Sequence, residues 1–226
     1  MNLIKSFSQI FMSLCISALT AQSPSVHENY KNIVFDLGGV LLEWAPQKFL
    51  SQVFENSDSV PDELVHIFNS SYWTDYDAGK ISREDLLNHL SLHYDRDQLI
   101  LFINQLPQLL RPVAEMERIL DDLKSKGYKI YSLSNTPQEI FYELNEIYDL
   151  FKKFDGKVAS FQIKSSKPSP LIYQTLLSLY HLKPEECLFI DDRAENVLGA
   201  QDCGIKGILY LNPKQLKNTL KELGIL

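Results

Sequence analysis

Short apolar runs alternate with longer amphipathic segments along the chain from residue 32 onwards. The short runs lie at 33–35, 130–133, 157–161, 188–190 and 208–211. Their length and apolar character are typical of strands that are buried on both faces of a sheet. The segments after them carry apolar residues every three or four positions, which is the spacing of amphipathic helices. This alternation predicts an α/β protein with a parallel sheet.

The region between the first two predicted strands carries no convincing strand. Its periodic segments, at about 46–56, 62–69, 83–93, 96–105 and 112–126, predict helices. Ser82 with Asp85 is typical of a capping box at the start of the third helix, and Gly127 is typical of a residue that ends the fifth. We therefore expect a helical cap over 46–111, inserted into a core formed by 30–45 and 112–226.

The first 21 residues differ in character from the rest of the chain. No charged residue occurs between Lys5 and Glu28, and 10–21 is apolar with small residues at its end. This pattern is typical of a secretory signal peptide cleaved after about Ala21; an uncleaved anchor and a misassigned start codon are the alternatives. The apolar run is too short and too polar to favour a membrane span. We expect export to the periplasm or medium, with a cytoplasmic location as the alternative, and no stable membrane span after processing.

The composition narrows the classes of partner. Of 226 residues, 45% are hydrophobic and 23% are charged, which is typical of a globular protein. The formal net charge of −7 and the absence of a long Lys/Arg run argue against binding to nucleic acid. An anionic substrate must therefore be bound by a few local cations or by a metal ion. The composition does not predict an oligomeric state.

Two cysteines, Cys187 and Cys203, follow Cys15 of the predicted signal segment. Neither has the spacing of a metal ligand relative to another Cys or His, which argues against a zinc site. The simplest interpretation is that both are small buried hydrophobic residues. The alternative is a disulfide, because a strand that begins at Cys187 and an antiparallel helix that ends at Cys203 bring the two close together.

Polar residues follow four of the predicted strands, in the part of a parallel α/β sheet that binds ligands. They are Asp36, Ser134 with Asn135, Lys167, and Asp191 with Asp192. Each alone has a structural explanation as a turn residue, a helix cap or a surface charge. Their combination, in this order and at these strand ends, indicates a catalytic site.

The motifs around these residues resemble those of the haloacid dehalogenase superfamily. The resemblance rests on FDLGGVLL at 35–42, WTDYDAGKIS at 73–82, LSNT at 133–136, SKP at 166–168 and FIDDRAENVLGA at 189–200. Within the superfamily, the motifs are most similar to the branch of sugar-phosphate phosphatases such as glucose-1-phosphatases. The resemblance implies a Rossmann-like parallel core with an inserted α-helical cap. It also implies a Mg²⁺-dependent phosphatase acting on a small phosphomonoester, with sugar phosphates among the candidates.

The resemblance also implies a role for each motif residue. Asp36 would be the nucleophile that forms an aspartyl-phosphate, and Mg²⁺ would be held by Asp36, the backbone carbonyl of Gly38, and Asp192. The Ser134 hydroxyl and the Asn135 N–H would bind phosphoryl oxygens. Lys167 would neutralise the attacking and transferring groups. The residues implied to orient the metal-bound waters or the lysine are Asp191 and Asn196.

One position departs from the superfamily pattern. Most of its phosphatases carry a second Asp two residues after the nucleophile, as general acid and base, and here that residue is Gly38. Losing a general acid costs a factor of about 10²–10⁴ in rate. Three explanations remain open: a leaving group that needs no protonation, a substitute group from the cap or the substrate, or a protein that binds phosphate without turning it over.

A metal-independent 2-haloacid dehalogenase also lacks the second Asp, and it is a further alternative. The pair Asp191 and Asp192 argues against it, because two carboxylates at an anion site are best explained by a cation between them.

The cap is expected to select the substrate. Trp44, Trp73, Tyr76 and Asp77 are the predicted substrate contacts at the interface between cap and core, where aromatic rings and an acidic group can hold a sugar. The alternative is that both tryptophans belong to the hydrophobic core of the cap.

Overall fold

Five parallel strands form one sheet at the centre of the protein. The computed structural model describes residues 29–53 and 66–226, so the predicted signal segment and parts of the first two predicted cap helices lie outside the described residues. The sheet order is β3-β2-β1-β4-β5. The strands are β1 (Asn32–Phe35), β2 (Lys129–Ser134), β3 (Gly156–Ala159), β4 (Cys187–Asp191) and β5 (Lys206–Leu209). All four pairings are parallel, which confirms the predicted α/β class.

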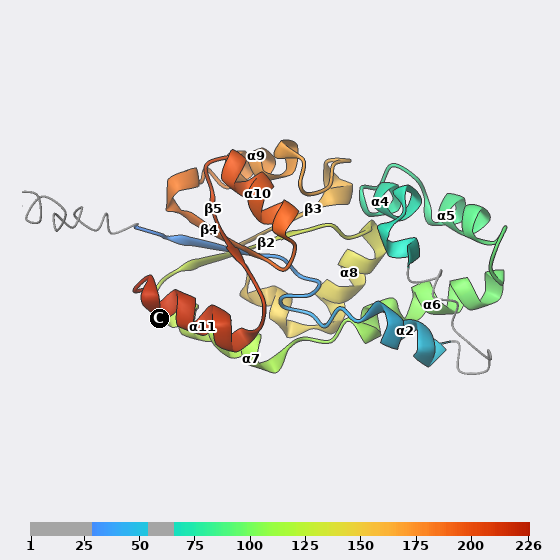
Figure 1. The fold of residues 1–226 in the computed structure, drawn as a ribbon, viewed down its shortest axis with the longest axis horizontal. Helices are drawn as coiled ribbons and strands as arrows, with labels where there is room; N and C mark the ends of the chain where they lie inside the picture. Colours follow the sequence, from blue (N-terminus) through green and yellow to red (C-terminus); the bar gives the residue numbers. More distant parts are fainter. Residues whose placement is uncertain (1–28, 54–65) are drawn as a thin grey trace, which may run out of the picture.

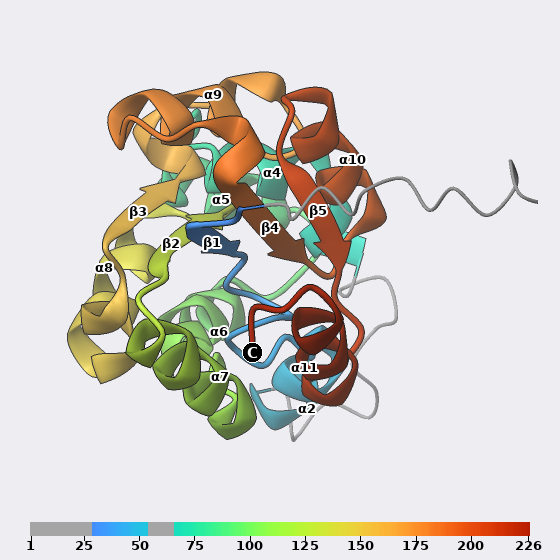
Figure 2. The same ribbon diagram turned by 90° about the vertical axis from the view of Figure 1, so that its left-hand side faces the viewer.

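Helices cover both faces of the sheet (Figures 1 and 2). One face carries α7 (Ala114–Ser125), α8 (Gln138–Ile147) and α11 (Pro213–Glu222), and the other carries α9 (Pro170–Leu179) and α10 (Ala194–Asp202). Side chains of successive strand residues point to opposite faces, so Ile33 and Phe35 pack in one core cluster and Val34 in the other. All three are completely buried. Burial on both sides explains why the strands read as apolar runs.

A group of helices between β1 and α7 lies beyond the carboxyl ends of the strands (Figure 1). It contains α2 (Pro46–Val53), the 3₁₀ turn η1 (His66–Asn69), α4 (Ser71–Asp77), α5 (Arg83–Leu90) and α6 (Arg96–Leu109). The sequence pattern did not predict α4, whose two buried side chains, Trp73 and Tyr76, are too few to show a periodicity.

The short connecting elements follow local capping chemistry. Ser82 and Asp85 form the predicted capping box at the start of α5. Gly127 follows α7 with φ +89°, a conformation that favours glycine. Three further 3₁₀ turns, η2 (Asp149–Lys153), η3 (Ser160–Gln162) and η4 (Pro184–Glu186), complete the described chain.

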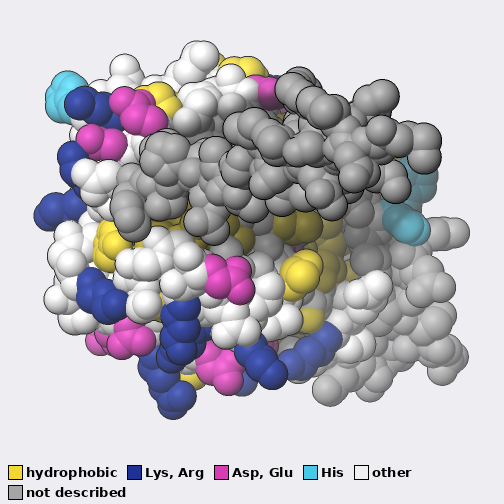
Figure 3. All heavy atoms as spheres, turned by 60° about the vertical axis from the view of Figure 1, so that its left-hand side comes forward, with side chains coloured by type: hydrophobic (Ala, Val, Ile, Leu, Met, Phe, Trp, Pro, Cys, Tyr) yellow, Lys and Arg dark blue, Asp and Glu magenta, His cyan; other side chains and the backbone are white. Residues whose placement is uncertain are grey.

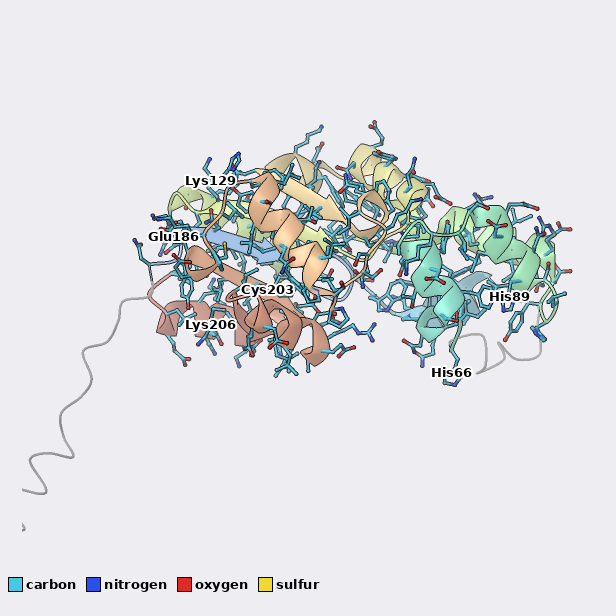
Figure 4. All side chains as sticks on the ribbon, turned by 90° about the horizontal axis from the view of Figure 1, so that it is seen from above. His66, His89, Lys129, Glu186, Cys203 and Lys206 are labelled. Carbon is cyan, nitrogen blue, oxygen red and sulfur yellow. The ribbon has the colours of Figure 1, made fainter. Side chains whose placement is uncertain are left out.

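Both cysteines of the core are free thiols, so the alternative of a disulfide is wrong. Cys187 is buried in β4, while Cys203 follows α10 (Figure 4). No helix in the described ranges is long and apolar enough to cross a membrane. The face seen in Figure 3 carries Lys and Arg side chains interspersed with Asp and Glu, with the basic residues gathered along its lower part.

Candidate active site

The polar strand-end residues meet at one cavity. Because β2, β1 and β4 are neighbours, their carboxyl ends lie side by side. A cavity of about 490 Å³ lies between this edge and the cap. The predicted site residues that line it are Asp36, Gly38, Ser134, Asn135, Lys167, Asp192 and Asn196. Asp191 is completely buried directly behind this lining.

Lys167 is the central cation of the cavity base. Its Nζ atom lies 2.7 Å from Asp36 Oδ1 and 2.7 Å from Asp191 Oδ2, and its side chain is 1% exposed. Burial alone would lower the pKa of Lys167, but the two carboxylates outweigh burial and raise it. The amine is therefore held as a permanent positive charge beside Asp36.

The loop that carries Lys167 is held by the Asn135 side chain and packs closely against α10. Asn135 Nδ2 donates to the Lys167 carbonyl at 3.0 Å, and the Lys167 N–H donates to Asn135 Oδ1 at 2.8 Å. On the other side, a Cβ at Gly199 would lie 2.7 Å from the carbonyl oxygen of Pro168, so only glycine lets α10 pack this closely. The sequence did not indicate this clamping role of the Asn135 side chain.

Asp191 and Asn196 form a buried support beneath Lys167. Asn196 Nδ2 lies 3.0 and 3.1 Å from the two Asp191 carboxylate oxygens, and the Arg193 N–H donates to Oδ1 at 2.9 Å. Tyr173 in turn donates its hydroxyl to the Asn196 carbonyl at 2.7 Å. These contacts orient the Asp191 carboxylate toward the lysine.

Asp36 has one oxygen engaged and one available. Oδ1 accepts hydrogen bonds from the Leu37 N–H at 2.7 Å and from Lys167. Oδ2 receives no hydrogen bond from another described residue. Burial raises the pKa of Asp36 to about 7, even though Lys167 opposes this shift. The unengaged oxygen has the position of a nucleophile or a metal ligand at the cavity base.

The acidic groups at this base fit a hard divalent cation. Carboxylate oxygens of Asp36, Asp191 and Asp192 lie within 4.8 Å of one another. The single ammonium group of Lys167 does not balance these three carboxylates, so the base has excess negative charge. Burial and the neighbouring Asp191 raise the pKa of Asp192. Carboxylate and carbonyl oxygens are the ligands that Mg²⁺ prefers.

A glycine shapes the metal side of the site. Gly39 has φ +82°, and a Cβ there would lie 2.4 Å from Asp192 Oδ2. Its neighbour Gly38 lines the cavity, and a Cβ at that position would meet nothing within 4 Å. Gly39 therefore lets the β1 loop approach Asp192, whereas Gly38 leaves space.

A chain of hydrogen bonds connects the cavity base to the cap. The hydroxyls of Ser134 and Thr136 lie 2.7 Å apart, and the Thr136 N–H donates to Ser160 Oγ at 3.0 Å. Ser160 Oγ donates to the backbone carbonyl of Asp77 at the end of α4. Thr136 and Ser160 were not among the predicted site residues, although Thr136 lies within the LSNT motif.

The four predicted cap contacts have different surroundings. Trp44, Trp73 and Asp77 line the cavity, and both tryptophan rings pack edge-on against Phe68. Tyr76 does not line it: the side chain is buried, and its hydroxyl donates to Glu139 on α8. The apolar wall of the cavity is formed by Leu42, Trp44, Phe68, Trp73, Leu106, Leu110, Ile140 and Leu144.

Comparisons with known proteins agree with this geometry. The family described as haloacid dehalogenase-like hydrolase matches residues 30–204. A sesquiterpene phosphatase from Aspergillus oryzae is 32% identical over 181 residues, which cover 79% of this chain and 89% of that protein.

Solved structures of the same family share the fold. A haloacid dehalogenase-like hydrolase from Porphyromonas gingivalis superposes with a TM-score of 0.68 at 26% identity, covering 86% of this chain and 98% of that one. A family enzyme from Bacteroides thetaiotaomicron, in complex with magnesium and inorganic phosphate, gives a TM-score of 0.59 at 22% identity, covering 79% and 93%. From the family match, the relatives and the strand-end site together, this chain belongs to the haloacid dehalogenase-like hydrolases.

Proposed function

We propose that this protein is a Mg²⁺-dependent phosphatase that hydrolyses small phosphomonoesters through an aspartyl-phosphate. The observation that carries the proposal is the arrangement of Asp36, Lys167 and Asp192 at the base of one cavity. A carboxylate that attacks a phosphate ester needs positive charge on both partners, and this base offers one buried ammonium and a set of oxygen ligands for a cation. The similarity to a sesquiterpene phosphatase supports the same reaction class.

The residues of the base divide the reaction between them. Asp36 Oδ2 attacks phosphorus, the alcohol departs, and water then hydrolyses the aspartyl-phosphate to release inorganic phosphate and restore Asp36. Lys167 neutralises the attacking carboxylate, while the Ser134 hydroxyl and the Asn135 N–H bind phosphoryl oxygens. Asp36, the Gly38 carbonyl and Asp192 would hold Mg²⁺, which supplies further positive charge to the phosphoryl group.

The cavity wall favours a substrate whose leaving group is apolar. Its volume of about 490 Å³ lies in the usual range for small-molecule sites, roughly 300–1,000 Å³. Eight apolar side chains from the β1 loop, the cap and α8 line the wall above a charged base. A phosphorylated hydrocarbon fits the apolar part of the lining better than a sugar phosphate does, because sugar hydroxyls that face these eight side chains would lack hydrogen-bond partners. The polar lining residues of the cap are Asn69, Thr74 and Asp77. The name of the Aspergillus relative is consistent with this choice.

The test of the reaction is phosphate release from 4-nitrophenyl phosphate by the full chain, with Mg²⁺ and with EDTA. Release that requires Mg²⁺ and is lost in Asp36→Asn supports the phosphatase. Binding of inorganic phosphate without any turnover would instead support a phosphate-binding protein. Chloride release from 2-chloropropionate in EDTA would support a dehalogenase.

We also propose that the protein is exported, on the pattern of residues 1–21 alone. The expected result is a mature N-terminus that follows about Ala21 in protein recovered from the periplasm or medium. An intact Met1 in cytoplasmic protein would contradict it.

A further inference from the structure

The cavity holds one acidic side chain that the reaction above does not use. The acidic residues among its described lining are Asp36, Asp77, Asp192 and Glu195. Asp36 is the nucleophile and Asp192 a metal ligand, while Glu195 is bound to Arg193 at 2.6 Å. Asp77 remains, and it comes from the cap rather than from a strand end.

We propose that Asp77 is a catalytic residue that donates the proton to the leaving alcohol. The proposal rests on the phosphatase function and fills the gap left at Gly38, which has no side chain to carry a proton. The cap then does more than enclose the substrate, because it supplies one of the reacting groups.

Three contacts fix the end of α4 to the core, and so fix Asp77 over the base. The Asp77 carbonyl accepts from Ser160, and the preceding residue, Tyr76, donates to Glu139 of α8. Gly79, with φ +64°, lies so close to Phe161 that a Cβ would be 3.1 Å from the Phe161 Cβ. Figure 1 shows α4 beyond the carboxyl ends of the strands, and α4 contacts η3, the turn that follows β3. Such anchoring is what a proton donor requires, because proton transfer demands a fixed distance to the reacting oxygen.

The surroundings of the Asp77 carboxyl favour the acid form. It makes no hydrogen bond or ion pair with another described side chain. Burial raises its pKa well above the usual value; Arg193 opposes this shift, and Asp36 adds to it. The Arg193 guanidinium is paired with Glu195 and makes no ion pair with Asp77.

The proposed step conserves atoms and charge. As Asp36 Oδ2 forms its bond to phosphorus, the bond between phosphorus and the ester oxygen breaks, and the Asp77 proton passes to that oxygen to give a neutral alcohol. In the second half, the Asp77 carboxylate takes a proton from the water that attacks the aspartyl-phosphate. Inorganic phosphate leaves, and Asp36 and protonated Asp77 are both restored.

The test compares two esters whose leaving groups differ in their need for a proton. The variants are Asp77→Asn, Gly38→Asp and the double variant, with Asp75→Asn as a matched control on the same helix. Asp75 is paired with Lys80 and does not line the cavity. Rapid mixing measures the first burst of product, which reports the phosphorylation of Asp36, from 4-nitrophenyl phosphate and from decyl phosphate. Circular dichroism confirms that each variant is folded.

The expected result is selective. Asp77→Asn slows the burst from decyl phosphate by about 10²–10⁴-fold, but leaves the burst from 4-nitrophenyl phosphate within about threefold. Steady-state phosphate release then becomes slow for both esters, because no base takes the proton from the water that hydrolyses the aspartyl-phosphate. In the double variant, the carboxyl group that Gly38→Asp adds has open space around it. It should restore at least part of the burst rate with decyl phosphate. Asp75→Asn matches the unaltered protein.

Two results would overturn the proposal while leaving the phosphatase intact. One is an equal loss of burst rate for both esters in Asp77→Asn, which would make Asp77 a binding residue. The other is an unchanged rate with decyl phosphate. If the unaltered protein turns over neither ester with Mg²⁺, the phosphatase function fails, and the role of Asp77 fails with it.

Discussion

The base and the wall of the cavity are built from opposite chemistry. The base comes from the ends of neighbouring strands. Its side chains Asp36, Lys167 and Asp191 are charged and buried, whereas Asp192 is exposed. Hydrogen bonds and ion pairs of 2.7–3.1 Å hold Lys167 and Asp191 in place. The wall comes mainly from cap helices and α8, and it consists of aromatic and aliphatic side chains without a polar network. The base therefore carries the nucleophile, the lysine and the metal ligands, and the wall determines which alcohol can leave. Asp77 is the exception, because it is the proposed proton donor and belongs to the cap.

The largest effect is expected from removing the nucleophile at the base. Asp36→Asn should lower kcat by about 10⁴-fold or more, because the amide cannot form the phosphoryl intermediate. The substitution is nearly isosteric and removes a buried group whose pKa burial raises, so the thermal midpoint should not fall. Full activity would contradict the assignment of Asp36. Phosphate release and thermal unfolding check the two parts.

The second effect tests the charge balance of the base. Lys167→Met should abolish turnover and lower the free energy of unfolding by about 3–5 kcal/mol, because Asp36 and Asp191 lose their shared partner. Lys152→Met, which removes an exposed pair with Asp149, is the control and should change neither property. Urea unfolding of both variants measures the difference, and equal stabilities would show that the buried pairs contribute little.

The two adjacent glycines offer a third test at the metal side. Gly39→Ala should weaken Mg²⁺ binding by about 10–100-fold, because its Cβ collides with Asp192 and its φ is unfavourable for alanine. Gly38→Ala places its Cβ in open space and should keep the affinity. Titration calorimetry compares the two. Equal affinities would mean that Asp192 does not depend on the close approach of this loop.

A fourth test addresses the wall alone. Trp44 is 37% exposed, so Trp44→Ala should leave the fold intact. The variant should lower kcat/KM for decyl phosphate about tenfold, the equivalent of about 60 Å² of lost apolar contact. For 4-nitrophenyl phosphate the change should be smaller. Tyr72→Ala, on the exposed side of the cap, is the control. A loss that is equal for both esters would break the division between base and wall.

The smallest effect is on stability and depends on pH. Burial raises the folded-state pKa of Asp36 to about 7 from an ordinary value of 3.8 in the unfolded chain. The folded protein therefore binds this proton more tightly, and the stability that it contributes is lost as the pH rises from about 4 through 7. Mg²⁺ competes with the proton, so saturating Mg²⁺ should raise the thermal midpoint by several degrees at pH 8 and much less at pH 5. An equal rise at both pH values would show that the ion binds elsewhere.

The sequence predicted the architecture because the central strands β1, β2 and β4 are buried on both faces, and each therefore carries a continuous apolar signal. The edge strand β5 is mostly exposed, with only Ile208 buried. It also predicted the base, because residues that follow neighbouring parallel strands must meet at one edge. Contacts between distant segments were not predictable in this way. The bond from Ser160 to the Asp77 carbonyl joins residues 83 positions apart, and nothing in the local pattern of either segment indicates the other.

The different roles of the two adjacent glycines could not be predicted from the sequence either. Gly38 and Gly39 are identical in type, yet one faces open space and the other touches Asp192. The wall illustrates the same limit, because an apolar residue in a cap helix has the same pattern whether it packs in the core or lines a cavity. Trp73, for example, is 4% exposed and does both.

The most direct test of the account is kcat/KM for a series of alkyl phosphates of increasing chain length, measured with Mg²⁺ and with EDTA. The account predicts an increase of about fourfold for each added CH₂ group until the wall is covered, which corresponds to about 0.8 kcal/mol of burial per group. It also predicts no turnover in EDTA. A flat profile, or faster hydrolysis of a sugar phosphate than of every alkyl ester, would contradict the assignment of an apolar leaving group.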